Sequence, residues 1–142
     1  SANIILGIEN HDRFKVKTLE HIIKTLASSH IGIVLDTVNS FGSLEPPELV
    51  VETLGPYTVN LHIKDFDVKR ASHNLGLEIY GTAAGQGRLD IPTVIKQLED
   101  YGREFTSILE FWAAPEITVE ASIAKEKNWA EQSIKYLKGL EG

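Results

Sequence analysis

The stretch Ile31–Ser40, IGIVLDTVNS, decides the fold class of this chain. Its first five residues are apolar or glycine, and they run directly into an acid, Asp36. A short run that is apolar and largely β-branched is typical of a parallel strand buried on both faces. An acid that ends such a strand lies where barrels and doubly wound sheets place their chemistry, at the carboxyl end. The stretch therefore predicts an α/β sheet with a polar site at the ends of its strands.

The same pattern occurs three more times along the chain. It is found in Ile4–Glu9 (IILGIE), Thr58–Phe66 (TVNLHIKDF) and Thr106–Trp112 (TSILEFW). These runs carry one acid or imidazole each near the end, namely Glu9, His62 and Glu110. Side chains alternate faces along a strand. On the face opposite these polar residues, every run carries large apolar side chains, as a face covered by helices should. We therefore expect Glu9, Asp36, His62 and Glu110 to point together into a shared interior.

Helical patterns separate the predicted strands. Strands are expected at about Asn3–Glu9, from Ile31 to Asp36, at Tyr57–Phe66 and at Phe105–Trp112, and helices at Phe14–Ser28, from Pro46 to Gly55, from Asp90 to Gly102, and at Thr118–Leu140. Asn10, His11 and Asp12 are expected to form a polar loop, and a second loop is expected through Asn39, Ser40 and Gly42. The last helix is expected to turn its apolar residues inward, namely Val119, Ile123, Ala130, Ile134 and Leu137. The segment Asp67–Arg88 has no clear periodicity and is predicted to be a long loop, of the kind that is usually functional or mobile. Four consecutive βα units follow, with parallel strands and right-handed crossovers. On pattern alone, an open sheet and a barrel are both possible.

Composition and charge narrow the class of protein. The 142 residues are enough for a single domain, 1–142, with a real core. The net charge of −6 argues against a nucleic-acid partner. The absence of cysteine is compatible with a reducing cytoplasm. No apolar run approaches the roughly 20 residues of a membrane span, and no secretory signal pattern is found. We therefore expect a cytoplasmic protein without nucleic-acid or membrane partners.

Clustering three carboxylates and one imidazole on one face has an electrostatic cost that must be offset. Singly, an acid at a strand end is more often a cap, a salt bridge or a loop residue than a metal ligand, but four in phase on four strands favour a metal site. Like charges in a desolvated site repel each other, and a divalent cation removes that cost. Glu and Asp oxygens with one His nitrogen suit Mn²⁺, Mg²⁺, Co²⁺ or Zn²⁺. Such an ion can polarise a carbonyl while a carboxylate moves a proton at the adjacent carbon.

Five stretches resemble the xylose isomerase-like TIM-barrel superfamily. They are ENHDRF around Glu9, VLDTVNSFG around Asp36, NLHIKDF around His62, GQGRLD at Gly85–Asp90 and ILEFW around Glu110. The resemblance covers essentially the whole chain, but it matches only strands five to eight, the C-terminal half of a (β/α)8 barrel. It implies that the family's metal tetrad is Glu9, Asp36, His62 and Glu110. It also implies that Glu9 and Glu110 form the acid–base pair that the family's epimerases use.

The resemblance implies an enzyme of carbohydrate metabolism, a metal-dependent sugar or sugar phosphate isomerase or epimerase that moves a proton through an enediolate. Two alternatives stay open: a metal-dependent dehydratase of the inosose type, and a catalytically silent sugar-binding half-barrel. The sequence departs from the family at Asn39, where a histidine often follows the aspartate by three residues. No Asp-x-His pair follows the third strand, which argues against a trinuclear zinc nuclease of the endonuclease IV kind.

Five further residues are expected to contact the sugar. His11 has the same parity as Glu9, although a solvated loop histidine is an equal alternative. Asn39 takes the place of the family's histidine. Lys64 is in phase with His62 and suits a substrate oxyanion or an ion pair with Asp65 or Glu9. Arg88 suits a phosphate or carboxylate, against a solvated loop arginine, and Trp112 suits a sugar face, against core packing.

A barrel of this family needs eight βα units and about 250 residues, and this chain supplies four units. Its first and last strands are then open edges that template further pairing. We therefore expect a fragment, or a chain that assembles with a missing N-terminal half-barrel or with a second copy. A symmetric pair would place two metal tetrads in one interior, which favours a natural N-terminal half. The isolated chain is expected to self-associate and to be weakly active or inactive.

Overall fold

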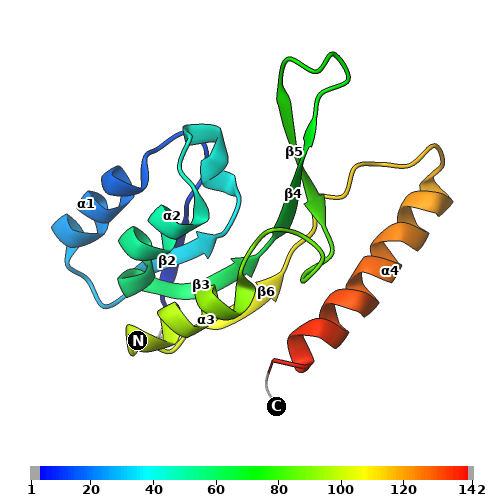
Figure 1. Cartoon of the computed structure of the whole chain (residues 1–142). Coiled ribbons are helices and arrows are strands. Elements are labelled where there is room, and N and C mark those ends of the chain that lie inside the picture. The colour runs from blue at the N-terminus through cyan, green and yellow to red at the C-terminus, as the bar shows by residue number, and fades with distance from the viewer. Residues whose placement is uncertain (1–3, 141–142) are drawn as a thin grey trace. The chain divides into compact units, whose positions relative to one another are not determined.

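A computed structural model describes residues 4–140 (Figure 1). Its elements are β1 (Leu6–Glu9), α1 (Val16–Leu26), β2 (Ile31–Asp36), η1 (Asn39–Ser43), α2 (Pro47–Leu54), η2 (Gly55–Tyr57), β3 (Thr58–Ile63), β4 (Asp65–Arg70), β5 (Leu77–Thr82), α3 (Ile91–Asp100), β6 (Thr106–Leu109) and α4 (Val119–Lys138). The chain divides into two compact units, one running up to Ile63 with Pro92–Ile108, the other holding Lys64–Ile91 and the residues from Leu109 onward. That residues 1–142 act as a single domain stays a prediction.

The four predicted strands form one sheet in the order β1-β2-β3-β6. Strands β1 and β2 are parallel, and so are β2 and β3. The register pairs Asp36 directly with His62 and pairs Glu9 with Val34. The α/β fold with parallel strands is therefore confirmed, and three of the expected ligands lie at or near the carboxyl ends of adjacent strands.

The core of the first unit lies where the alternation predicts it. Ile33, Leu35, Leu61 and Ile63, from β2 and β3, are all buried. Helices α1 and α2 pack together beside β2 and bury Val16, Leu19, Ile23, Val50, Val51 and Leu54. Burying an aliphatic side chain of this size is worth about 1.5–3 kcal/mol. Gly55 lets α2 and α3 approach, since a Cβ there would lie 2.5 Å from the Tyr101 ring.

The boundaries of several predicted elements are wrong. Strand β1 begins at Leu6, and Asn3 lies outside the described residues. Strand β2, by contrast, ends at Asp36 as predicted, and the backbone turns into η1 soon after it. Strand β3 ends at Ile63 instead of Phe66, and β6 ends at Leu109, so Glu110 and Trp112 lie just past the strand.

The predicted apolar faces are not all covered. On the outer strands of the sheet, Leu6, from the face predicted to be covered by helices, is 62% exposed, and Ile108, on the face of Glu110, is 50% exposed. On α4 the residues expected to face inward include Val119, 71% exposed, and Ile123, 60% exposed. Ser133 is the one buried residue in α4 among those described. These apolar side chains are therefore not covered by other residues of the part of the chain that the structure describes.

The predicted loop Asp67–Arg88 is wrong in its first part, which forms an antiparallel hairpin of β4 and β5. Its register pairs Asp67 with Tyr80. Strand β4 reads DFDVKR, in which charged and apolar residues alternate, so a period of two was present in the sequence. The turn is made possible by Asn74, whose φ is 60°, in the left-handed region that asparagine tolerates.

The GQGRLD segment is held by a single buried carboxylate, that of Asp65. It accepts hydrogen bonds from the backbone N–H groups of Gly85 and Gly87, each at 2.9 Å, and of Leu89 at 3.1 Å. A Cβ at Gly87 would lie 2.2 Å from Asp65 Oδ1, so only glycine fits. The segment therefore follows β5 as an ordered loop. No helix described here combines the length and the apolar character needed to cross a membrane.

Candidate metal centre

Three of the four expected ligands gather in the first unit. Glu9, Asp36 and His62 each offer one ligand atom, and these atoms lie within 4.8 Å of one another. His62 Nδ1 lies 3.6 Å from Glu9 Oε1 and 4.0 Å from Asp36 Oδ2. Those separations are too long for hydrogen bonds. They match ligand atoms around one cation, which lie roughly 3–4 Å apart when each is about 2.1 Å from the ion.

Asp36 is the rigid member of this cluster. Its side chain is fully buried. Its Oδ1 accepts hydrogen bonds from the backbone N–H of Val38 at 2.8 Å and of Asn39 at 2.7 Å. These bonds orient the carboxylate so that Oδ2 faces His62. A buried carboxylate is costly unless it is paired or binds a cation, so its burial here fits a ligand.

Asn10, predicted only as part of a polar loop, is a further residue of the site. Its side chain is buried completely. Its Oδ1 accepts from Asp36 N at 2.7 Å, and its Nδ2 donates to Asp36 O and to Ser40 Oγ, both at 2.9 Å. The amide therefore extends the ladder between β1 and β2 by one step beyond Glu9. Asparagine directly after a strand-end ligand was the available signal, because its amide can imitate a backbone peptide.

Glu9 is the accessible member of the cluster, with a side chain that is 39% exposed against 17% for His62. Asn39 Nδ2 donates to Glu9 Oε1 at 2.9 Å. Asn39 was expected to contact substrate at the position of the family's histidine. In the structure it orients a candidate ligand, and any contact with substrate stays a prediction. The carboxylate is thus fixed at one oxygen while the group stays open to solvent.

Glu110 belongs to the second unit, directly after β6. Its Oε1 lies 3.0 Å from Lys64 Nζ, and the lysine side chain is only 9% exposed. Lysine is rarely buried unless it is paired, so this ion pair accounts for the burial of Lys64. The expected alternatives for Lys64 were a substrate oxyanion or an ion pair with Asp65 or Glu9; the ion pair with Glu110 was not predicted.

The remaining expected substrate contacts lie on the surface of their units. His11 Nδ1 lies 2.6 Å from Asp12 Oδ1, and this hydrogen bond lowers the pKa of the exposed Asp12 carboxyl. Arg88 Nε donates to Asp67 Oδ1 at 2.5 Å and holds the pKa of Asp67 below its ordinary value. Trp112 is 37% exposed and donates from Nε1 to the backbone oxygen of Asp65 at 3.3 Å. Their roles toward a sugar stay predictions.

Comparison with known proteins gives consistent matches. The sequence model of the family described as xylose isomerase-like TIM barrel matches residues 1–140. The chain is 31% identical over 135 residues to 3-oxo-isoapionate decarboxylase of Pectobacterium atrosepticum, an alignment that covers 95% of this chain and 49% of that protein. The chain therefore spans about half the length of the curated relative that it matches.

Solved structures agree on the fold. A xylose isomerase domain protein from Planctomyces limnophilus superposes with a TM-score of 0.71 at 16% identity, over 96% of this chain and 46% of that one. A xylose isomerase-like TIM barrel protein from Mycobacterium smegmatis, solved in complex with magnesium, gives a TM-score of 0.67 at 15% identity, over 92% and 44% of the two chains. The likeness to half of each barrel confirms the half-barrel fold.

Proposed function

Because this chain belongs to the xylose isomerase-like TIM barrel family, we propose that it is the metal-binding half of a divalent-metal-dependent sugar or sugar phosphate isomerase or epimerase. Its main support is the cluster of Glu9, Asp36 and His62, whose ligand atoms lie within 4.8 Å of one another. Two carboxylates and an imidazole form a donor set that Mn²⁺, Mg²⁺, Co²⁺ and Zn²⁺ all accept. We include Glu110 as the fourth ligand because it directly follows β6, the strand beside β3.

A cation bound by this donor set supplies a Lewis acid for a substrate carbonyl. The residues of the chain then divide the remaining work according to their surroundings. Asp36 is buried and held by two backbone N–H groups, which makes it a fixed ligand without a part in proton transfer. Glu9 is exposed and oriented by Asn39, so it can reach a substrate carbon. Lys64 keeps the charge of Glu110 balanced.

The proposed reaction needs two proton-transfer groups. One glutamate, Glu9 or Glu110, removes the proton from the carbon next to the carbonyl, and the substrate becomes an enediolate. Returning a proton to the opposite face of the same carbon gives an epimer, and returning it to the neighbouring carbon gives an isomer. Both outcomes conserve atoms and leave the two carboxyl groups in their starting states once the exchange with solvent is complete.

Decarboxylation of a 3-oxo acid is the second candidate, favoured by the 31% identity to 3-oxo-isoapionate decarboxylase. Losing CO₂ next to a carbonyl leaves the same kind of enolate that proton removal produces. A glutamate would then donate a proton to the carbon instead of removing one. Loss of water, as in an inosose dehydratase, is a further fate of that enolate.

The rest of the barrel is proposed to come from an N-terminal half of four βα units. The chain spans about half of its curated relative. The outer strands of its sheet leave Leu6 and Ile108 largely exposed, as edges do when their neighbouring strands are absent. A second copy of the chain is the alternative partner. Sedimentation of the chain alone over a dilution series would reveal it as a dimer.

The reaction can be tested in a barrel completed with such an N-terminal half. Incubation with Mn²⁺ and a ketose in D₂O should place solvent deuterium beside the carbonyl, and Glu110→Gln should abolish the exchange because the carboxylate is lost. Glu104→Gln, at an exposed position just before β6, is the matched control and should exchange at the unmodified rate. CO₂ release from a 3-oxo acid without deuterium exchange in the ketose would replace the isomerase by the decarboxylase. If the barrel binds the sugar but shows neither deuterium exchange nor CO₂ release, the chain is part of a catalytically silent binding module.

A further inference from the structure

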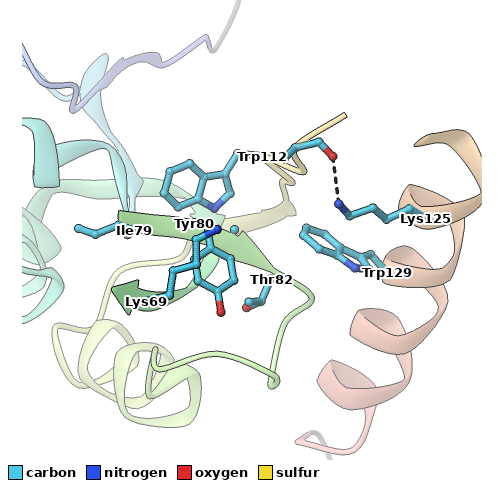
Figure 2. Close-up of a pocket in the computed structure, with 9 residues that line it drawn as sticks. Lys69, Ile79, Tyr80, Thr82, Trp112, Lys125 and Trp129 are labelled. Atoms are coloured by element: carbon cyan, nitrogen blue, oxygen red, sulfur yellow. Dashed lines mark hydrogen bonds between the residues drawn. The ribbon is translucent and has the colours of Figure 1, made fainter. Parts of the chain in front are cut away.

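The second unit contains a pocket of about 470 Å³ that the proposed metal chemistry does not use. Figure 2 shows its side chains coming from the β4–β5 hairpin (Lys69, Tyr80 and Thr82), from the segment after β6 (Trp112) and from α4 (Lys125 and Trp129). The volume is in the range of sites that enclose small organic ligands. All of these residues belong to the same compact unit.

The charged side chains that line the pocket are both lysines. Lys69 Nζ lies 3.0 Å from Glu78 Oε2, and Lys125 Nζ lies 2.7 Å from Glu116 Oε1, but neither glutamate is part of the lining. Lys125 Nζ also donates to the backbone oxygen of Ala114 at 3.0 Å, which leaves one of its three N–H donors for a ligand. In a chain of net charge −6, a pocket with cationic lining selects for anions.

The aromatic side chains are held in place before any ligand binds. Trp112 lies against the backbone of Gly81, where a Cβ would come within 2.4 Å of the indole ring. Trp129 packs edge-to-face on Phe111, with ring centroids 5.9 Å apart. Lys125 Nζ lies 5.4 Å from the centre of the Trp129 ring. An acid group that pairs with this lysine is therefore placed next to an indole face, so the ligand must carry an anionic group beside an apolar surface.

We infer that this pocket binds a small carbohydrate acid. Its carboxylate pairs with Lys125, and its ring face lies on the tryptophans. The preference for an anion follows from the pocket itself, whereas the choice of a carbohydrate rests on the proposed function. Lys69, whose side chain is 58% exposed, contributes less than Lys125 because solvent screens its charge.

Intrinsic fluorescence gives a direct test, because the chain contains two tryptophans and both line the pocket. Titration with D-glucuronate should change the emission in a saturable way, and higher salt should weaken the binding. D-glucose, which has a CH₂OH group in place of the carboxylate, should bind at least about tenfold more weakly, since it lacks the charge-assisted hydrogen bond. The apparent Kd should rise about tenfold in Lys125→Gln.

Lys127→Gln is the matched control, because Lys127 lies on the same helix, is 76% exposed and is outside the lining. It should bind glucuronate as tightly as the unmodified chain. If Lys125→Gln fails to fold by circular dichroism, Lys69→Gln replaces it, with a weaker affinity expected. The inference is overturned by the absence of a saturable change, by equal affinities for glucose and glucuronate, or by equal affinities of the folded lining variants and the unmodified chain.

A test of glucuronate binding can fail or succeed independently of the proposed function. The proposed Mn²⁺ ligands do not line this pocket, and Mn²⁺ binding is measured without any sugar. If glucuronate binds and Mn²⁺ does not, the proposed enzyme fails while the anion pocket stands. If Mn²⁺ binds and glucuronate does not, only the inferred pocket is lost.

Discussion

Replacing Asn10 by alanine tests whether a single buried amide holds the metal ligand Asp36 in place. The substitution removes the partner of three polar groups at once: the N–H and C=O of Asp36 and the hydroxyl of Ser40. All three residues are at most 1% exposed, so water reaches these groups poorly.

The expected loss of stability can be worked from those contacts. A buried polar group without a partner costs about 1–3 kcal/mol, so three of them cost about 3–5 kcal/mol after a water has partly refilled the space. Because a chain of this size loses about 3 °C of Tm per kcal/mol, the midpoint should fall by about 10–15 °C. The Asp36 carboxylate also loses its fixed position, so the Kd for Mn²⁺ should rise about tenfold or more.

Calorimetric unfolding and Mn²⁺ titration below the new midpoint measure the two effects separately. Asn128→Ala is the control, since Asn128 is an exposed residue of α4 and its loss should change the stability by less than about 0.5 kcal/mol. A purely structural Asn10 would lower Tm and leave the Mn²⁺ affinity of the folded protein unchanged. An Asn10→Ala variant with an unchanged Tm would refute the hydrogen-bond reasoning altogether.

Two further substitutions probe the second unit. Gly87→Ala should cost about 1–3 kcal/mol and speed amide exchange in the following loop, because its Cβ would lie 2.2 Å from Asp65 Oδ1. Gly102→Ala is the control: its Cβ would have no atom within 4 Å, so it should cost only about 1 kcal/mol for its φ of 70°. Amide exchange in the loop after Gly87 should stay slow in this variant. Arg88→Gln should raise the pKa of Asp67 toward its ordinary value in a carboxyl NMR titration, since Arg88 is the main cause of the lowering. In the unmodified chain, the lowered pKa of Asp67 stabilises the folded state at pH values above the ordinary carboxyl pKa, and this stabilisation is lost as the pH falls through the lowered pKa. If the pKa of Asp67 does not change in Arg88→Gln, the assignment of Arg88 as its main cause is wrong.

The parallel sheet could be predicted because its signal is local. Runs such as Ile31–Asp36 are apolar at almost every position, and the alternation of faces correctly separates Ile33 and Leu35 from Asp36. The same alternation brings His62 beside Asp36 in the sheet. Three candidate ligands thus follow from strand periodicity alone.

The rest depends on interactions between distant segments. The β4–β5 hairpin was missed because the polar residues of DFDVKR looked like a loop, although they alternate with Phe66 and Val68. Asn10 looked like a loop residue because its partners lie 26 and 30 residues away. The outward face of α4 was misjudged, because an amphipathic pattern predicts that a face will be covered without saying which chain segment covers it.

Calorimetric titration of the chain with Mn²⁺ tests the central claim most directly. One Mn²⁺ is expected to bind per chain, with a Kd at least about tenfold higher in Asp36→Asn, which loses a charged ligand while keeping its size. Asp100→Asn, at an exposed carboxylate that pairs with Lys96 on α3, should bind as the unmodified chain does. Equal stoichiometry and affinity in Asp36→Asn, or no Mn²⁺ binding by any of the three proteins, would contradict a metal centre built on Glu9, Asp36 and His62.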